Sequence, residues 1–168
     1  LKLLRASDIF PNYKNQELKG YSVTVQKIDD EAREEWGDFG VWAVKRKRPA
    51  AITREDVGKF IDEKGLDPAL DGSFTVRDTK GKPVKVKTVF QLYKELCAEY
   101  DLETTHQITG SPKELIVRLA RDLGTIKPVA LHTGEGVNHY FHCDITTRGT
   151  FLWTALTGNI GKPGAGVG

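Results

Sequence analysis

The fold is decided by residues 128–142, which run Pro128-Val129-Ala130-Leu131-His132-Thr133-Gly134-Glu135-Gly136-Val137-Asn138-His139-Tyr140-Phe141-His142. The first six form a short apolar run without alternation, the pattern of a strand that is covered on both faces of a parallel sheet. Two glycines and a polar segment with two histidines follow. Because open α/β sheets bind ligands at the carboxyl ends of their strands, we expect the functional site to lie in this segment.

The preceding segment predicts a helix over residues 111–123. Ser111 is the expected N-cap, Pro112 occupies the first helical position, where its missing N–H costs nothing, and Glu114 completes a capping box. Gly124 is expected to end the helix. Its core-facing residues are predicted to be Leu115, Ile116, Leu119, Ala120 and Leu123.

The following segment predicts a second helix over residues 145–156, with Asp144 as its N-cap and Gly158 in its C-terminal turn. Arg148 lies one turn inside, where it would either pair with Asp144 or reach forward to a phosphate. The buried face is predicted to consist of Phe151, Leu152, Ala155 and Leu156. The order helix, strand, loop, helix and glycine-rich turn predicts an α/β unit.

The first half of the chain predicts strands. Residues 22–28 alternate as a half-buried strand does, and residues 39–44 form a second candidate, so the two are expected to pair antiparallel. Residues 73–87 predict a hairpin around the turn Asp78-Thr79-Lys80-Gly81, since a type I turn favours Asp first and Gly fourth.

Two helices are also predicted in this half. One begins at the capping-box-like residues 53–56 and ends at Gly65, and the other begins at the capping box 88–91 and places Cys97 in its apolar, core-facing stripe. The predicted fold class is therefore α/β. A parallel-sheet α/β unit spans residues 106–168, and a β-hairpin-containing α+β elaboration spans residues 1–105.

Composition narrows the classes of function. The chain has 168 residues, 39% of them apolar, and no run of 18 apolar residues, so no membrane-spanning segment is expected. A net charge of +2 is too small to argue for nucleic acid. The basic run Lys45–Arg48 is interpreted as a solvated strand end, with a phosphate or partner patch as the alternative. Two cysteines make no disulfide framework, and the chain is expected to be part of a longer polypeptide.

The segment after the predicted strand supplies candidate ligand-binding groups. Gly134 and Gly136 permit positive φ and close approach of the backbone to a ligand. Asn138 tolerates left-handed backbone and offers a donor and an acceptor. His139 and His142 are able to hydrogen-bond a polyanion or shuttle a proton, while the plainer alternative for each is a packed, satisfied side chain.

A zinc site is a further alternative. It would draw on His132, His139, His142 and Cys143, whose short spacing fits a partial ligand set. Structural zinc usually takes ligand pairs from two separated knuckles, and the sequence has no second pair. No metal ligand is therefore assigned.

The end of the chain is rich in glycine, with Gly158, Gly161, Gly164 and Gly166 on either side of Pro163. Backbone with so few side chains suits the wrapping of a bulky anionic cofactor through N–H groups. It matches neither the phosphate-binding loop, which ends in Gly-Lys-Ser/Thr, nor the dinucleotide fingerprint, whose glycines open a helix instead of closing one.

Three strings together resemble the molybdopterin oxidoreductase family, also called the DMSO reductase superfamily. They are Ile108-Thr109-Gly110-Ser111-Pro112 with its helix, the loop Gly134–His139, and Leu156-Thr157-Gly158-Asn159-Ile160-Gly161-Lys162-Pro163-Gly164. The sequence of residues 138–142, together with Asp144 and Arg148, is most similar to one branch of this family. That branch contains nitrate reductase, nitrite oxidoreductase, and the perchlorate, selenate and ethylbenzene enzymes. The resemblance covers about the last 60 residues.

This resemblance implies a piece of a catalytic α subunit. The full-length parent would hold molybdenum bis(molybdopterin guanine dinucleotide) and a 4Fe-4S cluster, and would perform two-electron oxygen-atom transfer on a small oxyanion such as nitrate or nitrite. His139 is the implied catalytic residue, through a hydrogen bond in the substrate pocket. The implied cofactor-binding residues are Gly134, Gly136, Asn138, His139, His142, Gly158, Asn159, Gly161, Gly164 and Gly166.

The departures from the family pattern limit what this chain does alone. The iron–sulfur ligand motif, the segment with the aspartate that ligates molybdenum, and the C-terminal domain of the cofactor cage are absent. The chain by itself is therefore expected to hold no cofactor and to be inactive. The implied partners are an iron–sulfur β subunit and a haem-containing membrane or γ subunit.

A non-catalytic, partner-binding α/β module is the alternative function. The substrate, the direction of electron flow and the compartment (periplasmic, or membrane-associated at the cytoplasmic face) stay open at this point.

Overall fold

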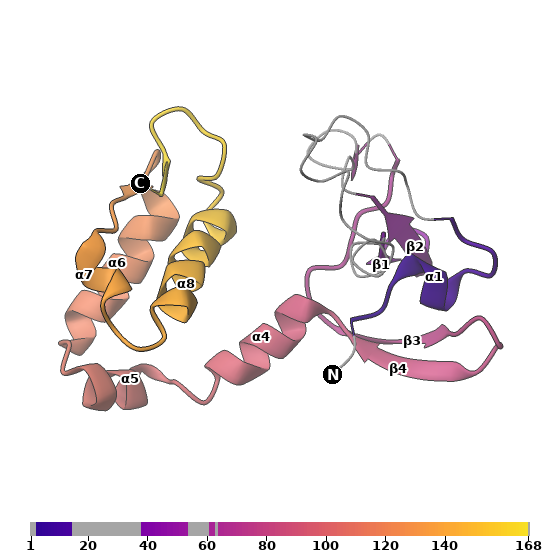
Figure 1. Ribbon diagram of the computed structural model, residues 1–168, viewed down its shortest axis with the longest axis horizontal. Coiled ribbons are helices and arrows are strands. Elements are labelled where there is room, and N and C mark those ends of the chain that lie inside the picture. Colours follow the sequence, from indigo (N-terminus) through magenta and orange to yellow (C-terminus); the bar gives the residue numbers. More distant parts are fainter. Residues whose placement is uncertain (1–2, 15–37, 54–60, 63, 168) are drawn as a thin grey trace. The chain divides into compact units, whose positions relative to one another are not determined.

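The computed structural model describes residues 3–14, 38–53, 61–62 and 64–167. They belong to two compact units, residues 1–98 and 99–168 (Figure 1). The sequence interpretation placed this boundary after residue 105. The expected strand 22–28 and most of the helix expected between residues 53 and 65 lie outside the described residues.

The first unit contains a hairpin of which the sequence predicted one strand and missed the other. Strand β1 (Phe39–Ala43) confirms the strand predicted there, but it pairs antiparallel with β2 (Arg48–Ile52), with Val41 opposite Ala50. The basic run forms the turn between these strands and the first residue of β2, and its four side chains are exposed. Strand β2 was missed because proline and alanine, which occupy three of its five positions, have low strand propensity.

The second hairpin was predicted correctly. Strands β3 (Ser73–Arg77) and β4 (Pro83–Lys87) pair antiparallel, with Val76 opposite Val84. In the turn, the Gly81 N–H donates to the Asp78 carbonyl at 2.9 Å, and Gly81 has φ +81°. A glycine is therefore required at this position, because a side chain rarely adopts that backbone conformation.

The core of the first unit lies between α1 (Ala6–Ile9) and the hairpins. The Phe74 ring stacks on Trp42 of β1, with centroids 4.6 Å apart and an interplanar angle of 13°. A Cβ on Gly40 would lie 2.6 Å from Ile9 Cδ1, so this glycine allows the close packing of α1 on β1. The buried apolar residues are Ala6, Ile9, Ala43, Leu66 and Val76.

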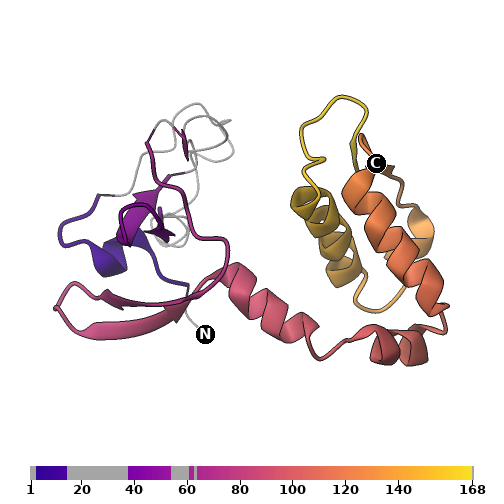
Figure 2. The same cartoon turned by 180° about the vertical axis from the view of Figure 1, so that it is seen from behind.

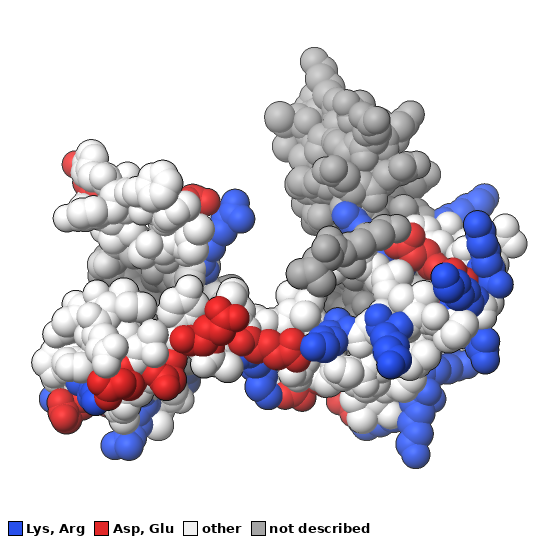
Figure 3. Space-filling model, turned by 90° about the horizontal axis from the view of Figure 1, so that it is seen from below, with Lys and Arg blue, Asp and Glu red and all other residues white. Residues whose placement is uncertain are grey.

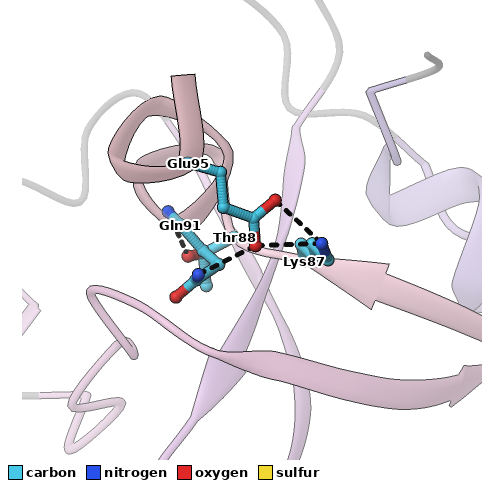
Figure 4. Close-up of polar contacts among 4 residues, drawn as sticks. All are labelled: Lys87, Thr88, Gln91 and Glu95. Atoms are coloured by element: carbon cyan, nitrogen blue, oxygen red, sulfur yellow. Dashed lines mark hydrogen bonds and ion pairs between the residues drawn. The ribbon is translucent and has the colours of Figure 1, made fainter. Parts of the chain in front are cut away.

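Helix α4 (Val89–Cys97) begins where the capping box predicted. Thr88 Oγ1 accepts a hydrogen bond from the Gln91 N–H at 3.0 Å, but the Gln91 side chain donates to Glu95 at 2.9 Å instead of closing the box (Figure 4). Lys87 also pairs with Glu95, at 2.8 Å, and holds the pKa of that carboxyl below its usual range. Cys97 is exposed, which corrects its predicted core position. Leu92 and Tyr93 of the same stripe are half-buried, so the described residues cover the stripe only in part.

The second unit opens with α5 (Leu102–Thr109), a helix that the sequence interpretation missed. Asp101 caps it by accepting from the Thr104 N–H at 2.8 Å, and Gly110 ends it with φ +70°. An Asp cap and a terminal Gly with eight residues between them were the available signal. Helix α6 (Lys113–Thr125) follows, with Pro112 as its N-cap and no side-chain cap, so Ser111 does not have its predicted capping role and Gly124 does not end the helix.

The corner between α5 and α6 leads to a testable prediction. The Lys113 ammonium pairs with Glu103 and, with a hydrogen bond from Gln107, holds the pKa of Glu103 below its usual range. We expect Lys113→Met to raise the pKa of Glu103 toward its ordinary value, as an NMR pH titration of the Glu103 carboxyl would show.

Because the pKa of Glu103 is lowered by folding, its stabilising effect is present above the pKa of the unfolded chain and is lost as the pH falls through the folded value. Lys80 lies on the β3–β4 hairpin, so Lys80→Met is the control and should leave the titration of Glu103 unchanged. An unchanged curve in the Lys113 variant would contradict the assignment.

The rest of the second unit consists of β5 (Ala130–Leu131), α7 (Glu135–Asn138), α8 (Cys143–Leu156) and β6 (Gly166–Val167). Figures 1 and 2 both show α6 and α8 side by side. The Lys127 ammonium donates to the Leu123 carbonyl at 3.1 Å and to the Thr157 carbonyl, so it joins the C-terminal ends of these two helices.

The predicted buried faces of α6 and α8 are largely exposed. Leu115 and Leu119 are 57% and 50% exposed, and Phe151 and Leu156 are each 49% exposed. The periodicity located the apolar stripes, but the described residues cover them only in part: Ile116, Leu123 and Leu152 are half-buried. Within the described part of this unit, only Thr154 and Asn159 are fully buried. None of the described helices has the length and apolar character needed to cross a membrane.

Candidate functional site

The candidate site lies in a strand–helix–strand unit. β5 and β6 pair parallel, Ala130 with Gly166 and Leu131 with Val167, and α7 and α8 form the crossover between them. In such a unit the segment after the first strand lies at the carboxyl edge of the sheet, and the segment before the second strand lies at the amino edge. The parallel pair agrees with the expected α/β unit, but Ala130 is exposed, so β5 is not covered on both faces. The fold class of the whole chain stays a prediction.

Residues 134–139 lie at the carboxyl edge and form a helical turn instead of the expected loop. Gly134 is the N-cap of α7, with φ −115°, and Val137 N–H donates to its carbonyl at 3.0 Å. Neither Gly134 nor Gly136 has positive φ, so the predicted left-handed glycines are not found here. Asn138 ends α7 and His139 follows as its C-cap, and both are exposed.

His142 carries the unusual backbone of this edge. It has φ +62° and ψ +28°, and it is the N-cap of α8 without a side-chain cap. Its ring centroid lies 3.9 Å from that of Phe141, which is 90% exposed. A left-handed residue other than glycine is uncommon and often marks a functional segment. The left-handed position predicted for Asn138 is therefore occupied by His142.

Asp144 does not have its predicted capping role, and one of the two alternatives for Arg148 is not found. Asp144 lies inside the first turn of α8 and does not cap it. Its charge still favours the positive end of the helix. Within the part of the chain that the structure describes, no ion pair joins Asp144 to Arg148, so this alternative for Arg148 is not found.

The zinc alternative has no support. Among the described residues, which include His132, His139, His142 and Cys143, no three His, Cys, Asp or Glu side chains lie close enough together to hold a metal ion.

The glycine-rich segment has the predicted backbone freedom but lies at the other edge. Gly158, Gly161 and Gly164 have φ between +68° and +74°, and Gly158 follows the C-terminal end of α8 as predicted. These residues come after α8, whose 14 residues span about 20 Å. The structure therefore brings Gly134, Asn138 and the two histidines to the carboxyl edge, and it does not bring the glycine-rich turn to them.

Asn159 is the buried polar residue of this turn. Its side chain is 1% exposed; Oδ1 accepts from the Val129 N–H at 3.0 Å, and Nδ2 donates to Thr157 Oγ1 at 2.8 Å. Its own N–H donates to the Thr154 carbonyl at 2.8 Å. Asn159 therefore joins the turn to the start of β5. Its expected place at the border of a cofactor cleft stays a prediction.

Sequence reasoning missed this Asn159 contact. Thr154 and Asn159 are polar, so hydrophobic periodicity does not predict that they are buried. Their burial in the structure is the only sign of their role. The one available signal was a lone Asn among glycines, which also fits an ordinary turn.

The chain is similar in sequence to several known proteins. It is 35% identical over 137 residues, 79% of its length, to the perchlorate reductase α subunit of Dechloromonas aromatica. It is 31% identical over 166 residues, 99% of its length, to the respiratory nitrate reductase α subunit of Haloferax mediterranei. A shorter match, 38% over 66 residues, is to a dimethyl sulfoxide reductase of Escherichia coli. No family model matches.

These relatives are catalytic α subunits of molybdopterin oxidoreductases. The chain belongs to the same family, the DMSO reductase superfamily, as the three strings of sequence indicated. It spans 14% of the length of the perchlorate reductase subunit and 16% of that of the nitrate reductase subunit.

Proposed function

We propose that this chain is part of the catalytic subunit of a molybdenum-dependent oxidoreductase that transfers an oxygen atom to or from a small oxyanion, with nitrate or nitrite as the leading substrate. The observation that carries the proposal is the similarity of 79% and 99% of the chain to subunits named for perchlorate and nitrate reduction.

The exposed apolar faces of α6 and α8 support a larger working protein. Isolated apolar residues are normal on a surface, but amphipathic helices expose whole faces only where something else packs on them. In this proposal those faces, which include Leu115, Leu119 and Phe151, pack against other segments of the catalytic subunit.

The carboxyl edge fits one side of a pterin cofactor. Its imidazoles and the Asn138 amide are exposed, and they supply the donors and acceptors that a polar, anionic pterin needs. In this proposal the residue that ligates molybdenum lies in another segment of the parent, as the family resemblance implies. When bound, the cofactor supplies the two-electron redox change.

The roles of this chain in the reaction are binding and proton handling. His139 would hydrogen-bond an oxygen of the substrate and hold a proton at an imidazole nitrogen, and Asn138 beside it would orient the same group. Gly134 and Gly136 would let the backbone of α7 approach the cofactor closely.

The proposal extends to the rest of the enzyme. It includes the bis(guanine dinucleotide) form of the cofactor, a 4Fe-4S cluster, an iron–sulfur β subunit and a haem-containing membrane or γ subunit, all on the strength of the family resemblance.

The purified full-length protein tests the proposal directly. We expect it to contain molybdenum in stoichiometric amount and to oxidise reduced viologen only when an oxyanion is added. Nitrate, nitrite and perchlorate should be compared, because the relatives' names do not distinguish among substrates for this protein. Protein from cells grown without molybdate is the control and should be inactive. A molybdenum-replete protein that reduces or oxidises none of the three would contradict the proposed substrate class.

A further inference from the structure

A hollow of about 500 Å³ opens in the first unit, between the segment after α1 and strand β2. Neither the family assignment nor the proposed reaction makes use of it. Its lining residues are Phe10, Tyr13, Arg46, Arg48, Pro49, Ala50 and Ala51. We call this hollow the β2 groove.

The walls of the β2 groove are mostly apolar and are held in place. The rings of Phe10 and Tyr13 lie with their centroids 6.1 Å apart at an interplanar angle of 40°. The Tyr13 hydroxyl donates to Asp38 Oδ2 at 2.7 Å, which fixes the orientation of that ring. Pro49 and the two alanines after it are half-buried and too small to fill the space. The groove therefore accommodates an apolar side chain without rearrangement.

Two arginines give the same groove a positive charge. Arg46 Nη2 donates to the Lys64 carbonyl, so the guanidinium is oriented while most of its N–H donors stay available. Arg48 makes no ion pair within the described residues, and neither Lys45 nor Lys47 of the same turn does. None of the groove's lining residues is acidic.

We infer that the β2 groove docks an acidic, extended segment of a partner protein, with an apolar side chain in the hollow and carboxylates on Arg46 and Arg48. Guanidinium groups match carboxylates in a planar, two-point geometry, and an apolar pocket beside them supplies an anchor. The basic run thus has the role of a partner patch, which was the alternative to a solvated strand end.

Nucleic acid fits the groove less well. The chain as a whole carries a charge of only +2. The two aromatic rings of the groove, Phe10 and Tyr13, are tilted by 40° to each other, so they do not form a row of parallel platforms for successive bases. Basic side chains do gather over the first unit on the face shown in Figure 3. Lys80 and Lys85 of the β3–β4 hairpin do not line the groove, so they supply an internal control.

The experiment uses the intact protein and a fluorescein-labelled twelve-residue peptide of Glu and Asp with a central Phe. We expect binding that weakens as salt is added and a loss of about tenfold or more in affinity in the double variant R46E/R48E. The matched control K80E/K85E places the same charge change on the β3–β4 hairpin and should stay within about threefold of the parent protein.

The double variant must be shown to be folded, by an unchanged melting temperature and an unchanged circular dichroism spectrum, since Arg46 contacts the Lys64 carbonyl. If the double variant is not folded, the single variant Arg48→Glu takes its place in the binding measurement. The inference is overturned if the peptide does not bind, if both variants bind it as the parent does, or if an oligothymidylate or a phosphatidylserine vesicle of equal charge is preferred. These outcomes are independent of the molybdenum assay.

Discussion

Asn159→Leu is expected to lower the free energy of unfolding by about 2–4 kcal/mol. The substitution leaves the Val129 N–H without its acceptor in a buried place and removes the donor to Thr157 Oγ1. An unpaired buried donor costs more than a hydrogen bond contributes, because the group has lost its water as well. Urea unfolding of the variant and the parent protein measures the difference.

Hydrogen exchange locates the effect. The Val129 amide should lose protection in Asn159→Leu, and Asn159→Asp, which keeps the acceptor oxygen, should retain more of it. Asn138→Ala is the matched control, since Asn138 is exposed in the same unit and should change the stability by less than about 0.5 kcal/mol. Equal effects of the two Asn substitutions would contradict the role assigned to Asn159.

His139→Ala in the full-length protein is expected to lower turnover about 100-fold while it changes the free energy of unfolding by less than about 0.5 kcal/mol. The imidazole is exposed and makes no hydrogen bond within the described residues, so folding has little to lose. A hydrogen bond to charge that develops on the substrate oxygen would be lost in the variant. Steady-state viologen assays and thermal unfolding separate the two effects.

His142→Ala provides the comparison at the same edge. The left-handed backbone of His142 makes its substitution more costly to α8, whereas a smaller effect on turnover is expected. Unchanged steady-state kinetics in His139→Ala would reject the proposed role.

Short-range chemistry in the sequence predicted much of the local structure. The Asp78–Gly81 turn and the Thr88 cap were predicted correctly because each depends on hydrogen bonds within a few residues. Helix α6 begins and ends two residues later than predicted, and Asp144 lies in the first turn of α8 without capping it. A capping residue type marks a helix end only to within one or two residues. Helix α5 was missed although Asp101 and Gly110 marked its ends.

For the candidate site, too, the sequence predicted the local segment but not its neighbours in space. The segment from Gly134 to His142 was recognised from its residue types and its place after a strand, and the structure places it at the carboxyl edge. The expected convergence with the glycine-rich turn was not found, because residues on either side of a crossover helix lie at opposite edges of a parallel sheet.

The sequence by itself determined the family of this protein, its hairpin turn, its helical stripes and the residue types of its carboxyl edge, because all of these depend on local order and composition. Only the tertiary structure decided that His142 takes the left-handed position, that Asn159 is buried against Val129, and that Arg46 and Arg48 border an apolar hollow. These features arise from contacts between residues far apart in the chain, and no periodicity or spacing in one segment encodes the identity of its partner in another.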